Sequence, residues 1–233
     1  MKALILAAGL GTRLKPFTDH TPKALFKVEG KTLLEHCLNH LKTFGIHEVI
    51  LNVHHFPDQI IGFLKIHENF GMKITFSDES DELLDTGGGM KKTSWFFSDG
   101  EPFLVRNVDI ISDLDLEKMN LYHQRKGGIV TLAVRNRETS RYFLFDEHDR
   151  LSGWENKELG ERKITRKAAH YEPLAFSGIQ IVNPSVFNFI DETGKFSLTD
   201  LYLRLSGNQS IIAFREQGSC WRDAGKSDPG NRS

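Results

Sequence analysis

The chain has 233 residues, of which 39% are hydrophobic and 26% are charged. This balance is typical of a globular protein and excludes disordered, collagen-like and coiled-coil chains. Thirty basic and 31 acidic residues give a net charge of −1, which provides no overall attraction to nucleic acids or to anionic membranes. With two cysteines and no apolar run of about 18 residues, we expect a cytoplasmic protein with neither nucleic acid nor membrane as a partner.

Strand-like and helix-like segments alternate through the first part of the chain. Short apolar runs predict strands at residues 3–7, 48–53, 72–76 and 103–105. Apolar residues spaced three and four positions apart predict helices over residues 32–44, from Pro57 onward, and over 87–97. Strands alternating with helices across short connections predict an α/β fold, a Rossmann-like mixed, mainly parallel sheet with helices on both faces. The opening residues also resemble a signal peptide, but no convincing cleavage site follows them, so a buried first strand is favoured.

The second part of the chain is richer in predicted strands, at residues 129–134, 142–145 and 174–182. Helices are predicted over residues 116–125, 184–190 and 198–205. No internal repeat or linker interrupts the pattern, so we expect a single domain over residues 1–233. Residues 226–233 are polar and turn-like, where a closing helix would be expected.

A glycine-containing loop follows the first predicted strand, at the edge where open parallel sheets bind ligands. Gly9 and Gly11 allow a sharp bend that presents backbone N–H groups to an anion, and Arg13 and Lys23 add two cations suited to a polyphosphate. A dinucleotide-binding fingerprint fails because Leu14 stands where its third glycine is required, and a Walker A loop fails because position 25 is not glycine. An ordinary turn with surface charges is the structural alternative for the two glycines alone.

The whole string from Leu6 to Lys23 (Leu-Ala-Ala-Gly-x-Gly-Thr-Arg-Leu-x-Pro-x-Thr-x-x-x-Pro-Lys) resembles the signature of the sugar-1-phosphate nucleotidyltransferases. Later segments resemble other parts of that family's sequence pattern. Residues 82–89 resemble its base-reading loop, and residues 103–109 resemble the strand leading to its metal aspartate. Residues 153–157 resemble its sugar-phosphate segment, residues 176–179 its sugar-pocket strand, and residues 221–225 the segment with its second metal aspartate. The resemblance implies the nucleotide-diphospho-sugar transferase fold, with a nucleotide-binding half (residues 1–115) and a sugar-phosphate-binding half (residues 116–233).

The implied reaction is attack of a sugar 1-phosphate oxygen on the α-phosphorus of an NTP, with release of pyrophosphate. By resemblance, the catalytic residues are Arg13, which holds the β- and γ-phosphates, Lys23, which neutralises charge at the α-phosphate, and the metal ligands Asp109 and Asp223. The implied cofactor is Mg²⁺, which prefers oxygen ligands and is usually held by one or two carboxylates together with phosphates. Without the resemblance, each aspartate is better explained as a turn residue or a helix cap.

The resemblance also implies the binding residues. Lys157 is expected at the sugar phosphate, Glu155 at the sugar hydroxyls and Gly178 beneath the sugar ring, although Glu155 and Lys157 taken alone are a solvated charge pair. The expected nucleotide-binding residues are Leu6, Ala8, Gly9, Leu10, Gly11, Thr12, Arg13, Lys23, Glu82, Thr86, Gly87, Gly88 and Asn107.

Three residues depart from the family pattern. Val108 replaces a common glycine, Leu83 a common proline, and Asp85 a common Glu or Gly. A β-branched residue beside Asp109 restricts the backbone and would crowd the ribose or the sugar phosphate. A catalytically weak domain that senses sugar nucleotides is therefore one alternative to an enzyme.

Among the nucleotidyltransferases, the compact length and the triple glycine most resemble short uridylyl- and guanylyltransferases acting on N-acetylmuramate, mannose or heptose phosphates. Glu82 and the triple glycine favour UTP, with GTP next. The predicted partners are thus an NTP and a sugar 1-phosphate, and the product is an NDP-sugar for cell-wall or surface polysaccharide synthesis. A phosphocholine cytidylyltransferase is the alternative enzyme, an NAD-dependent oxidoreductase is disfavoured by Leu14, and the oligomeric state is open.

Overall fold

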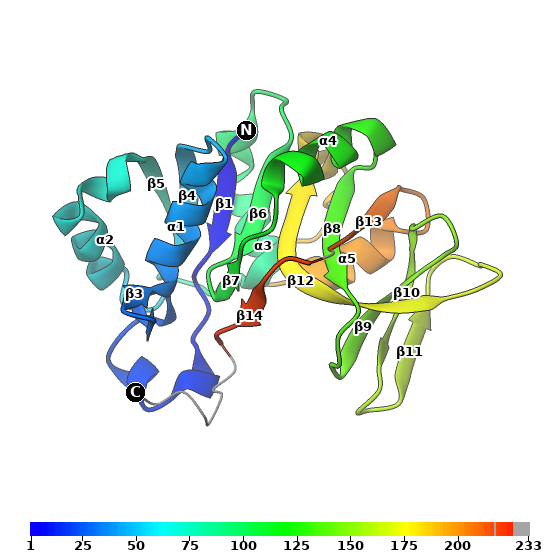
Figure 1. Cartoon of the computed structure of the whole chain (residues 1–233), viewed down its shortest axis with the longest axis horizontal. Coiled ribbons are helices and arrows are strands. Elements are labelled where there is room, and N and C mark those ends of the chain that lie inside the picture. The colour runs from blue at the N-terminus through cyan, green and yellow to red at the C-terminus, as the bar shows by residue number, and fades with distance from the viewer. Residues whose placement is uncertain (217, 226–233) are drawn as a thin grey trace.

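The computed structural model describes residues 1–216 and 218–225 (Figure 1). Its main sheet has ten strands in the order β11-β10-β9-β12-β6-β1-β4-β5, with β8 pairing β12 and β13 pairing β8. The sheet is continuous across the N-terminal half (residues 1–115) and the C-terminal half, as far as the structure describes it. No helix within the described ranges is long and apolar enough to cross a lipid bilayer.

The N-terminal half forms the parallel part of the sheet. All four strands predicted there are confirmed to within two residues at each end; they are β1 (Ala3–Leu6), β4 (Glu48–Val53), β5 (Lys73–Asp78) and β6 (Phe103–Asn107). β1 is central, paired in parallel with β4 on one side and with β6 on the other. The carboxyl ends of these strands therefore share one edge of the sheet.

Among the residues that the structure describes, five α-helices cover both faces of the sheet; they are α1 (Leu33–Thr43), α2 (Pro57–Ile66), α3 (Asp85–Lys92), α4 (Leu116–Lys126) and α5 (Leu198–Leu205). Side chains of α1, α2 and α4 share a core with Ala3 and Ile5 of β1, whereas α3 and α5 share one with Leu4 and Leu6. Because both faces are buried, β1 is apolar throughout rather than alternating. The predicted mixed sheet with helices on both faces is confirmed.

The C-terminal half is mostly antiparallel. Its predicted strands are confirmed as β8 (Val130–Arg135), β9 (Arg141–Phe145) and β12 (Glu172–Val182). The long β12 joins the two halves because it pairs with β6 as well as with β8 and β9. The sequence did not predict β7 (Ile110–Ser112), β10 (Leu151–Asn156), β11 (Glu161–Ile164), β13 (Ile211–Arg215) or β14 (Trp221–Asp223).

Two helix predictions were wrong in detail. The helix expected over residues 87–97 is α3, which begins at Asp85 and is followed by a separate 3₁₀ turn, Ser94–Phe97. The segment predicted as helical over 184–190 is a 3₁₀ helix, Pro184–Phe189. Further short elements are the hairpin β2 (Lys27–Val28) and β3 (Lys31–Thr32), and 3₁₀ turns at Thr12–Leu14, Phe17–Asp19, Lys23–Leu25 and Glu68–Gly71. The expectation for residues 226–233 lies outside the described residues.

Candidate functional site

A cavity of about 470 Å³ opens at the carboxyl ends of β1, β4 and β6. This is the edge at which open α/β sheets bind their ligands. The loop after β1 supplies most of the lining, and most of the residues predicted to bind the nucleotide are among those that line it. The lining comprises Leu6, Ala8, Gly9, Leu10, Gly11, Thr12, Arg13, Lys23, Asn52, Leu83, Asp85, Thr86, Asn107, Asp109 and Lys195.

The loop after β1 is folded back over Lys23. Gly11 has a φ of 63°, and a Cβ at this position would lie 2.8 Å from the Thr18 side chain and 3.0 Å from Lys23 Cβ, so only glycine fits. The N–H groups of Gly9, Leu10 and Gly11 find no hydrogen-bond partner in residues 1–216 and 218–225. Successive unpaired N–H groups of this kind form a concave site for an anion.

Asn52, buried at the end of β4, fixes the start of this loop. Its Oδ1 accepts hydrogen bonds from the N–H groups of Ala7 at 2.7 Å and Ala8 at 3.3 Å. Its Nδ2 donates to Glu79 Oε1 at 2.8 Å, and Glu79 Oε2 accepts from the Leu84 N–H at 3.2 Å. One buried pair thus positions both the glycine loop and the segment before α3. Sequence reasoning missed Asn52, although a polar residue inside the apolar run of β4 was a signal.

Lys23, Asp109 and Asp223 converge at the edge of the cavity. Lys23 Nζ forms an ion pair with Asp109 Oδ2, and both side chains are largely buried. A Cβ on Gly225 would overlap Asp109 Oδ2 and would lie 3.0 Å from Lys23 Nζ and 3.1 Å from Asp223 Oδ1. The three groups therefore surround a single point, and the two carboxylates lie on the same side of the molecule as Lys23.

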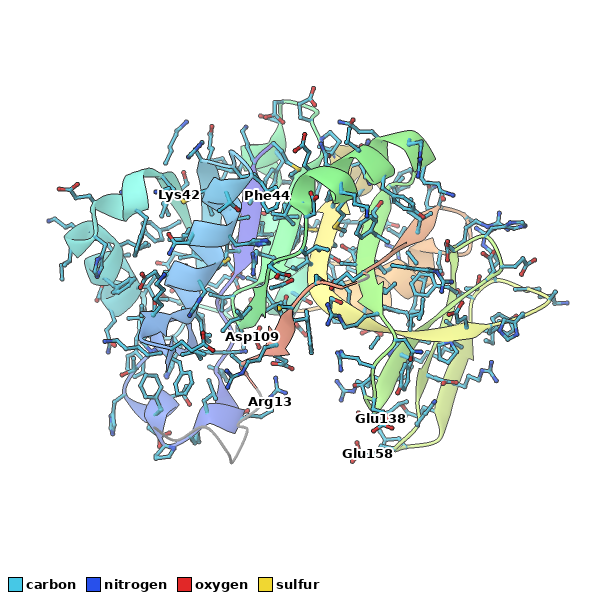
Figure 2. All side chains as sticks on the ribbon, viewed as in Figure 1. Arg13, Lys42, Phe44, Asp109, Glu138 and Glu158 are labelled. Carbon is cyan, nitrogen blue, oxygen red and sulfur yellow. The ribbon has the colours of Figure 1, made fainter. Side chains whose placement is uncertain are left out.

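The short ladder between β7 and β14 brings the two aspartates together. Asp109 directly precedes β7, and Asp223 ends β14, where it lies opposite Ile110 in the antiparallel register. The Ala224 N–H donates to the Asp109 carbonyl oxygen at 2.9 Å. Arg13 approaches from the loop, with Nη1 3.9 Å from Asp223 Oδ2, and Figure 2 shows Arg13 and Asp109 on the same side of the molecule, next to β14.

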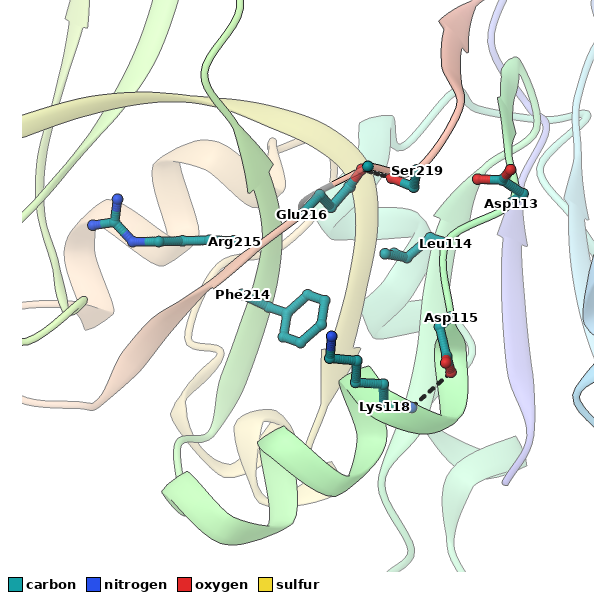
Figure 3. Close-up of a pocket in the computed structure, with 9 residues that line it drawn as sticks. Asp113, Leu114, Asp115, Lys118, Phe214, Arg215, Glu216 and Ser219 are labelled. Carbon is teal, nitrogen blue, oxygen red and sulfur yellow. Dashed lines mark hydrogen bonds between the residues drawn. The ribbon is translucent and has the colours of Figure 1, made fainter.

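The strap between β13 and β14, described at residue 216 and at residues 218–220, is held by contacts from both halves of the chain. Arg135 forms an ion pair with the fully buried side chain of Glu216, and its Nη2 donates to Ser219 Oγ at 2.9 Å. The Ser219 hydroxyl also donates to Glu216 at 3.0 Å, beside a cavity of about 290 Å³ (Figure 3). From the N-terminal half, Asp113 Oδ1 accepts from the Cys220 N–H at 2.7 Å. These contacts fix the point from which β14 begins.

The buried side chain of Arg106 supports the turn that carries Asp109. Its side chain is 1% exposed, and its Nη2 donates to the Ile110 carbonyl oxygen at 2.6 Å. Its Nη1 lies 2.7 Å from Nδ1 of His40, whose Nε2 lies 2.9 Å from the Leu114 carbonyl oxygen. With these partners His40 is neutral, accepting at Nδ1 and donating at Nε2. Burial, reinforced by the charge of Arg106, lowers the pKa of His40 to about 4.

Val108 does not crowd the cavity. Its side chain is 2% exposed and packs in the core under α1, while its N–H donates to the Leu6 carbonyl oxygen at 3.1 Å. The other two departures from the expected pattern, Leu83 and Asp85, do line the cavity, and Asp85 has a positive φ of 61°. The β-branched residue beside Asp109 is therefore accommodated by the core.

Three residues predicted to read the base do not line the cavity. Glu82 is exposed, whereas Gly87 and Gly88 are buried in α3 and both donate their N–H groups to the Phe196 carbonyl oxygen, at 2.9 and 3.2 Å. A Cβ on Gly87 would overlap the Phe196 ring, so this glycine allows α3 to approach the segment before α5. This packing also explains why a helix tolerates three consecutive glycines. Thr86 of the same predicted loop does line the cavity.

The three residues predicted to bind the sugar phosphate lie in the C-terminal half. Glu155 Oε1 is 3.9 Å from Lys157 Nζ, which in turn lies 4.5 Å from the Tyr142 ring centroid. Gly178 has a φ of 77°, and a Cβ there would lie 2.7 Å from Ile110 Cγ1. Gly178 therefore lets β12 pass close behind the turn that carries Asp109, and its position beneath a sugar ring stays a prediction.

The donor set at the converging carboxylates suits a hard divalent cation. Asp109 and Asp223 offer carboxylate oxygens, and no group of three or more His, Cys, Asp or Glu side chains that could hold a metal occurs within the described part of the chain. Mg²⁺ is commonly bound by one or two carboxylates, with waters and substrate phosphates completing its shell. The residues present therefore fit Mg²⁺ bound together with a phosphate ligand.

Sequence comparisons identify the family of the chain. The profile of the family described as nucleotidyl transferase matches residues 2–229. Over 233 residues the chain is 32% identical to a probable mannose-1-phosphate guanylyltransferase 1 of Oryza sativa subsp. japonica, covering 97% of this chain and 62% of that protein. It is 31% identical to an N-acetylmuramate alpha-1-phosphate uridylyltransferase of Caulobacter vibrioides, covering 96% of this chain and 91% of that protein. The chain thus spans less than two thirds of the guanylyltransferase and most of the uridylyltransferase.

Solved structures share the fold. A putative glucose-1-phosphate thymidylyltransferase from Bacillus anthracis superposes with a TM-score of 0.79 at 21% identity, over 97% of this chain and 90% of that one. A UDP-glucose pyrophosphorylase in complex with UDP-glucose superposes with a TM-score of 0.76 at 18% identity, over 96% of this chain and 93% of that one. At these identities the likeness concerns the fold.

Proposed function

The chain belongs to the nucleotidyl transferase family, and from this premise we propose that it transfers a nucleotidyl group from an NTP to a sugar 1-phosphate, releasing pyrophosphate. The observation that carries the proposal is the convergence of Lys23, Asp109 and Asp223 beside a glycine loop whose N–H groups are unpaired among the described residues. Two polyanions must meet in this reaction, and such a site offsets their repulsion with fixed positive charge.

In the proposed mechanism, the triphosphate lies along the loop after β1. The N–H groups of Gly9 to Gly11 donate to its oxygens, and Arg13 at the rim stabilises the negative charge that develops on the departing pyrophosphate. The Lys23 ammonium donates hydrogen bonds to Asp109 and to the α-phosphate. It thereby neutralises negative charge on the α-phosphate oxygens from the position that its ion pair with Asp109 fixes. Mg²⁺, held by Asp109 and Asp223, would supply further charge neutralisation and orient the phosphates.

For the substrates, we propose UTP as the preferred nucleotide, with GTP next. The names of the two relatives support this pair, because one is a uridylyltransferase acting on N-acetylmuramate 1-phosphate and the other a guanylyltransferase acting on mannose 1-phosphate. The proposed product is an NDP-sugar for cell-wall or surface polysaccharide. The cytoplasm is the proposed compartment, supported by Cys37 and Cys220, which are both free thiols.

The alternatives have less support. A sensing domain with a crippled site was suggested by Val108, whose side chain lies in the core and leaves the cavity open. A phosphocholine cytidylyltransferase finds no specific support among the described contacts. We therefore retain both only as outcomes of the experiment below.

The test is a pyrophosphate-release screen of ATP, CTP, GTP, UTP and TTP against a panel of sugar 1-phosphates and phosphocholine, with Mg²⁺ or with EDTA. We expect turnover that requires both a sugar 1-phosphate and Mg²⁺, and that is highest with UTP or GTP. Release with CTP and phosphocholine alone would replace the proposal with the cytidylyltransferase. If no pair releases pyrophosphate while nucleotides still bind, the protein is a sensing domain.

A further inference from the structure

A second cavity, of about 190 Å³, lies in the C-terminal half between β9, β10, β12 and the start of α5. Aromatic side chains, including those of Trp154 and Phe176, form much of its wall. Two guanidinium groups, from Arg137 and Arg141, also line it, and none of the described lining residues is acidic. The cavity thus combines a flat apolar surface, suited to the C–H face of a sugar ring, with a local excess of positive charge.

Two contacts connect the residues around this second cavity with the candidate reaction centre. On one side, the Arg137 guanidinium stacks on Trp221, two residues before Asp223, with its Cζ 4.3 Å from the ring centroid. On the other side, Thr199 lines the cavity next to Leu198, whose N–H donates to Thr86 Oγ1 of the nucleotide cavity at 2.9 Å. Figure 2 shows Glu138, in the loop between Arg137 and Arg141, at the same lower side of the molecule as Arg13 and Asp109.

Within the described ranges, both arginines lack a carboxylate partner. Neither Arg137 nor Arg141 lies within 4.0 Å of an acidic group in residues 1–216 and 218–225, whereas nearby Arg135 is paired with Glu216. Arg137 is half-buried; its Nη2 donates to the Phe176 carbonyl oxygen at 3.1 Å, but its Nε is buried and has no partner in the same residues. Burying a charged group without an adjacent counter-ion is unfavourable, so an anionic ligand would stabilise the half-buried Arg137. Arg141 is exposed at the start of β9, where its guanidinium can bind an anion in the cavity.

The 1-phosphate of the acceptor would lie near only one of the two arginines, Arg137. To attack the α-phosphorus, the 1-phosphate must lie near Lys23 and Asp109, which places it on the Trp221 side of Arg137. Arg141 instead begins β9, opposite Asn156 of β10, and belongs to the wall of the hairpin. When the anomeric phosphate lies at the reaction centre, Arg141 would therefore face another substituent of the sugar ring.

We propose that the second cavity is the acceptor-sugar subsite and that it selects a sugar 1-phosphate bearing an additional anionic group, which Arg141 binds while Arg137 spans the sugar and the reaction centre. This inference rests on the proposed function and makes it narrower, because it distinguishes acidic acceptors from neutral hexose phosphates. Carboxylate and phosphate substituents share the required chemistry, since a guanidinium binds either through two parallel hydrogen bonds.

The test compares acceptors that differ only in the second anion. One pair is N-acetylmuramate 1-phosphate and N-acetylglucosamine 1-phosphate, which differ by a lactyl carboxylate; the other is glucose 1,6-bisphosphate and glucose 1-phosphate. We expect kcat/KM to be at least about tenfold higher for the acidic member of one pair, and that pair identifies the anion. Arg141→Gln should reduce this acidic-to-neutral ratio about tenfold, mainly by raising KM for the acidic acceptor.

Arg125→Gln is the matched control, because Arg125 is an arginine on α4 outside the second cavity. It should leave the ratio unchanged. Equal rates within both pairs, or an Arg141→Gln variant that slows both members equally, would overturn the inference. If no acceptor supports turnover, the proposed function fails instead. In that event calorimetric binding of the acidic acceptors still decides the subsite, because binding that Arg141→Gln abolishes supports it and no binding refutes it.

Discussion

The polar and charged residues around the nucleotide cavity and around the second cavity are held in different ways. In the N-terminal half, polar groups near the nucleotide cavity have fixed partners: Asn52 is bound to Glu79, Arg106 to His40 and Lys23 to Asp109. In the C-terminal half, Arg137 and Arg141 have no ion-pair partner among the described residues, and Lys157 lies 3.9 Å from Glu155. Polar groups with fixed partners suit the phosphoryl chemistry that a whole family shares. Arginines without an ion-pair partner can instead bind a group of the acceptor and so select it.

The largest effect is expected when one of the converging carboxylates at the edge of the nucleotide cavity is neutralised. We expect Asp109→Asn and Asp223→Asn each to reduce kcat by roughly three orders of magnitude, because each removes a charge at the reaction centre without changing its shape. Pyrophosphate release measures the loss, and circular dichroism should show an intact fold. The exposed Asp191→Asn is the control and should retain activity. Wild-type rates in either site variant would refute the assignment.

Removing Lys23 should have the next largest effect. Lys23→Ala eliminates the partner of Asp109 and the cation next to the α-phosphate, and we expect kcat/KM to fall about a hundredfold or more. Lys27→Ala, an exposed lysine four residues further on, controls for general loss of positive charge. A loss below about tenfold would mean that Lys23 serves the fold rather than the reaction.

The boundary between the halves can be tested through Gly178. Gly178→Ala imposes both an unfavourable positive φ and a contact with Ile110, and we expect the free energy of unfolding to fall by about 2–3 kcal/mol. Gly71→Ala is the matched control, because Gly71 has a similar φ of 70° but a Cβ there would meet no described atom within 4 Å. Its cost should be about 1 kcal/mol. Equal costs in denaturant unfolding would show that the close approach of β12 is unimportant.

The smallest expected effect is on the pH dependence of stability. Burial lowers the pKa of His40 and of His123 from 6.5 to about 4, with the charge of Arg106 also contributing at His40. The unfolded chain therefore binds more protons between these values, so stability is complete above pH 6.5 and decreases as the pH falls toward 4. After allowance for partial solvent exposure, we expect a loss of about 1–2 kcal/mol per histidine.

One variant from each half separates the two histidines. His40→Gln and His123→Gln should each flatten the pH dependence of the unfolding free energy between pH 4 and 6.5, whereas the exposed His148→Gln should not. If neither variant changes the slope, the two rings are not the groups that take up protons on unfolding. A larger change for His40 would agree with the extra repulsion from Arg106.

Sequence reasoning located what is local and missed what forms between distant segments. The run from Leu6 to Lys23 could be found because its glycines and cations lie in one loop. Asp109 could be placed at the end of a buried apolar strand, but its role at a metal was predicted through the resemblance. Asp223 was predicted only through the resemblance, since β14 has three residues, too few for a periodic pattern. The pair Asn52–Glu79 and the contact of Arg106 with His40 each join residues far apart in the chain.

The base-reading loop shows why the remaining details could not be predicted. The triple glycine was interpreted as part of a loop facing the base, but the space beside Gly87 is occupied by Phe196, a residue from the other half. Likewise Val108 was expected to narrow the site, and it packs in the core instead. Which side of the backbone a residue faces depends on packing that a single sequence does not record.

The ladder of β7 and β14 has a consequence for how the halves cooperate. Asp223 is carried by a strand that leaves the C-terminal half and ends on a turn of the N-terminal half, and its strap is anchored by Arg135 on one side and Asp113 on the other. Because the ladder and the hydrogen bond from the Ala224 N–H to the Asp109 carbonyl oxygen hold both aspartates on one turn of the N-terminal half, a rotation between the halves would move the two carboxylates as one unit. The spacing of the carboxylate pair is thus set by the ladder and does not depend on which acceptor the C-terminal half binds.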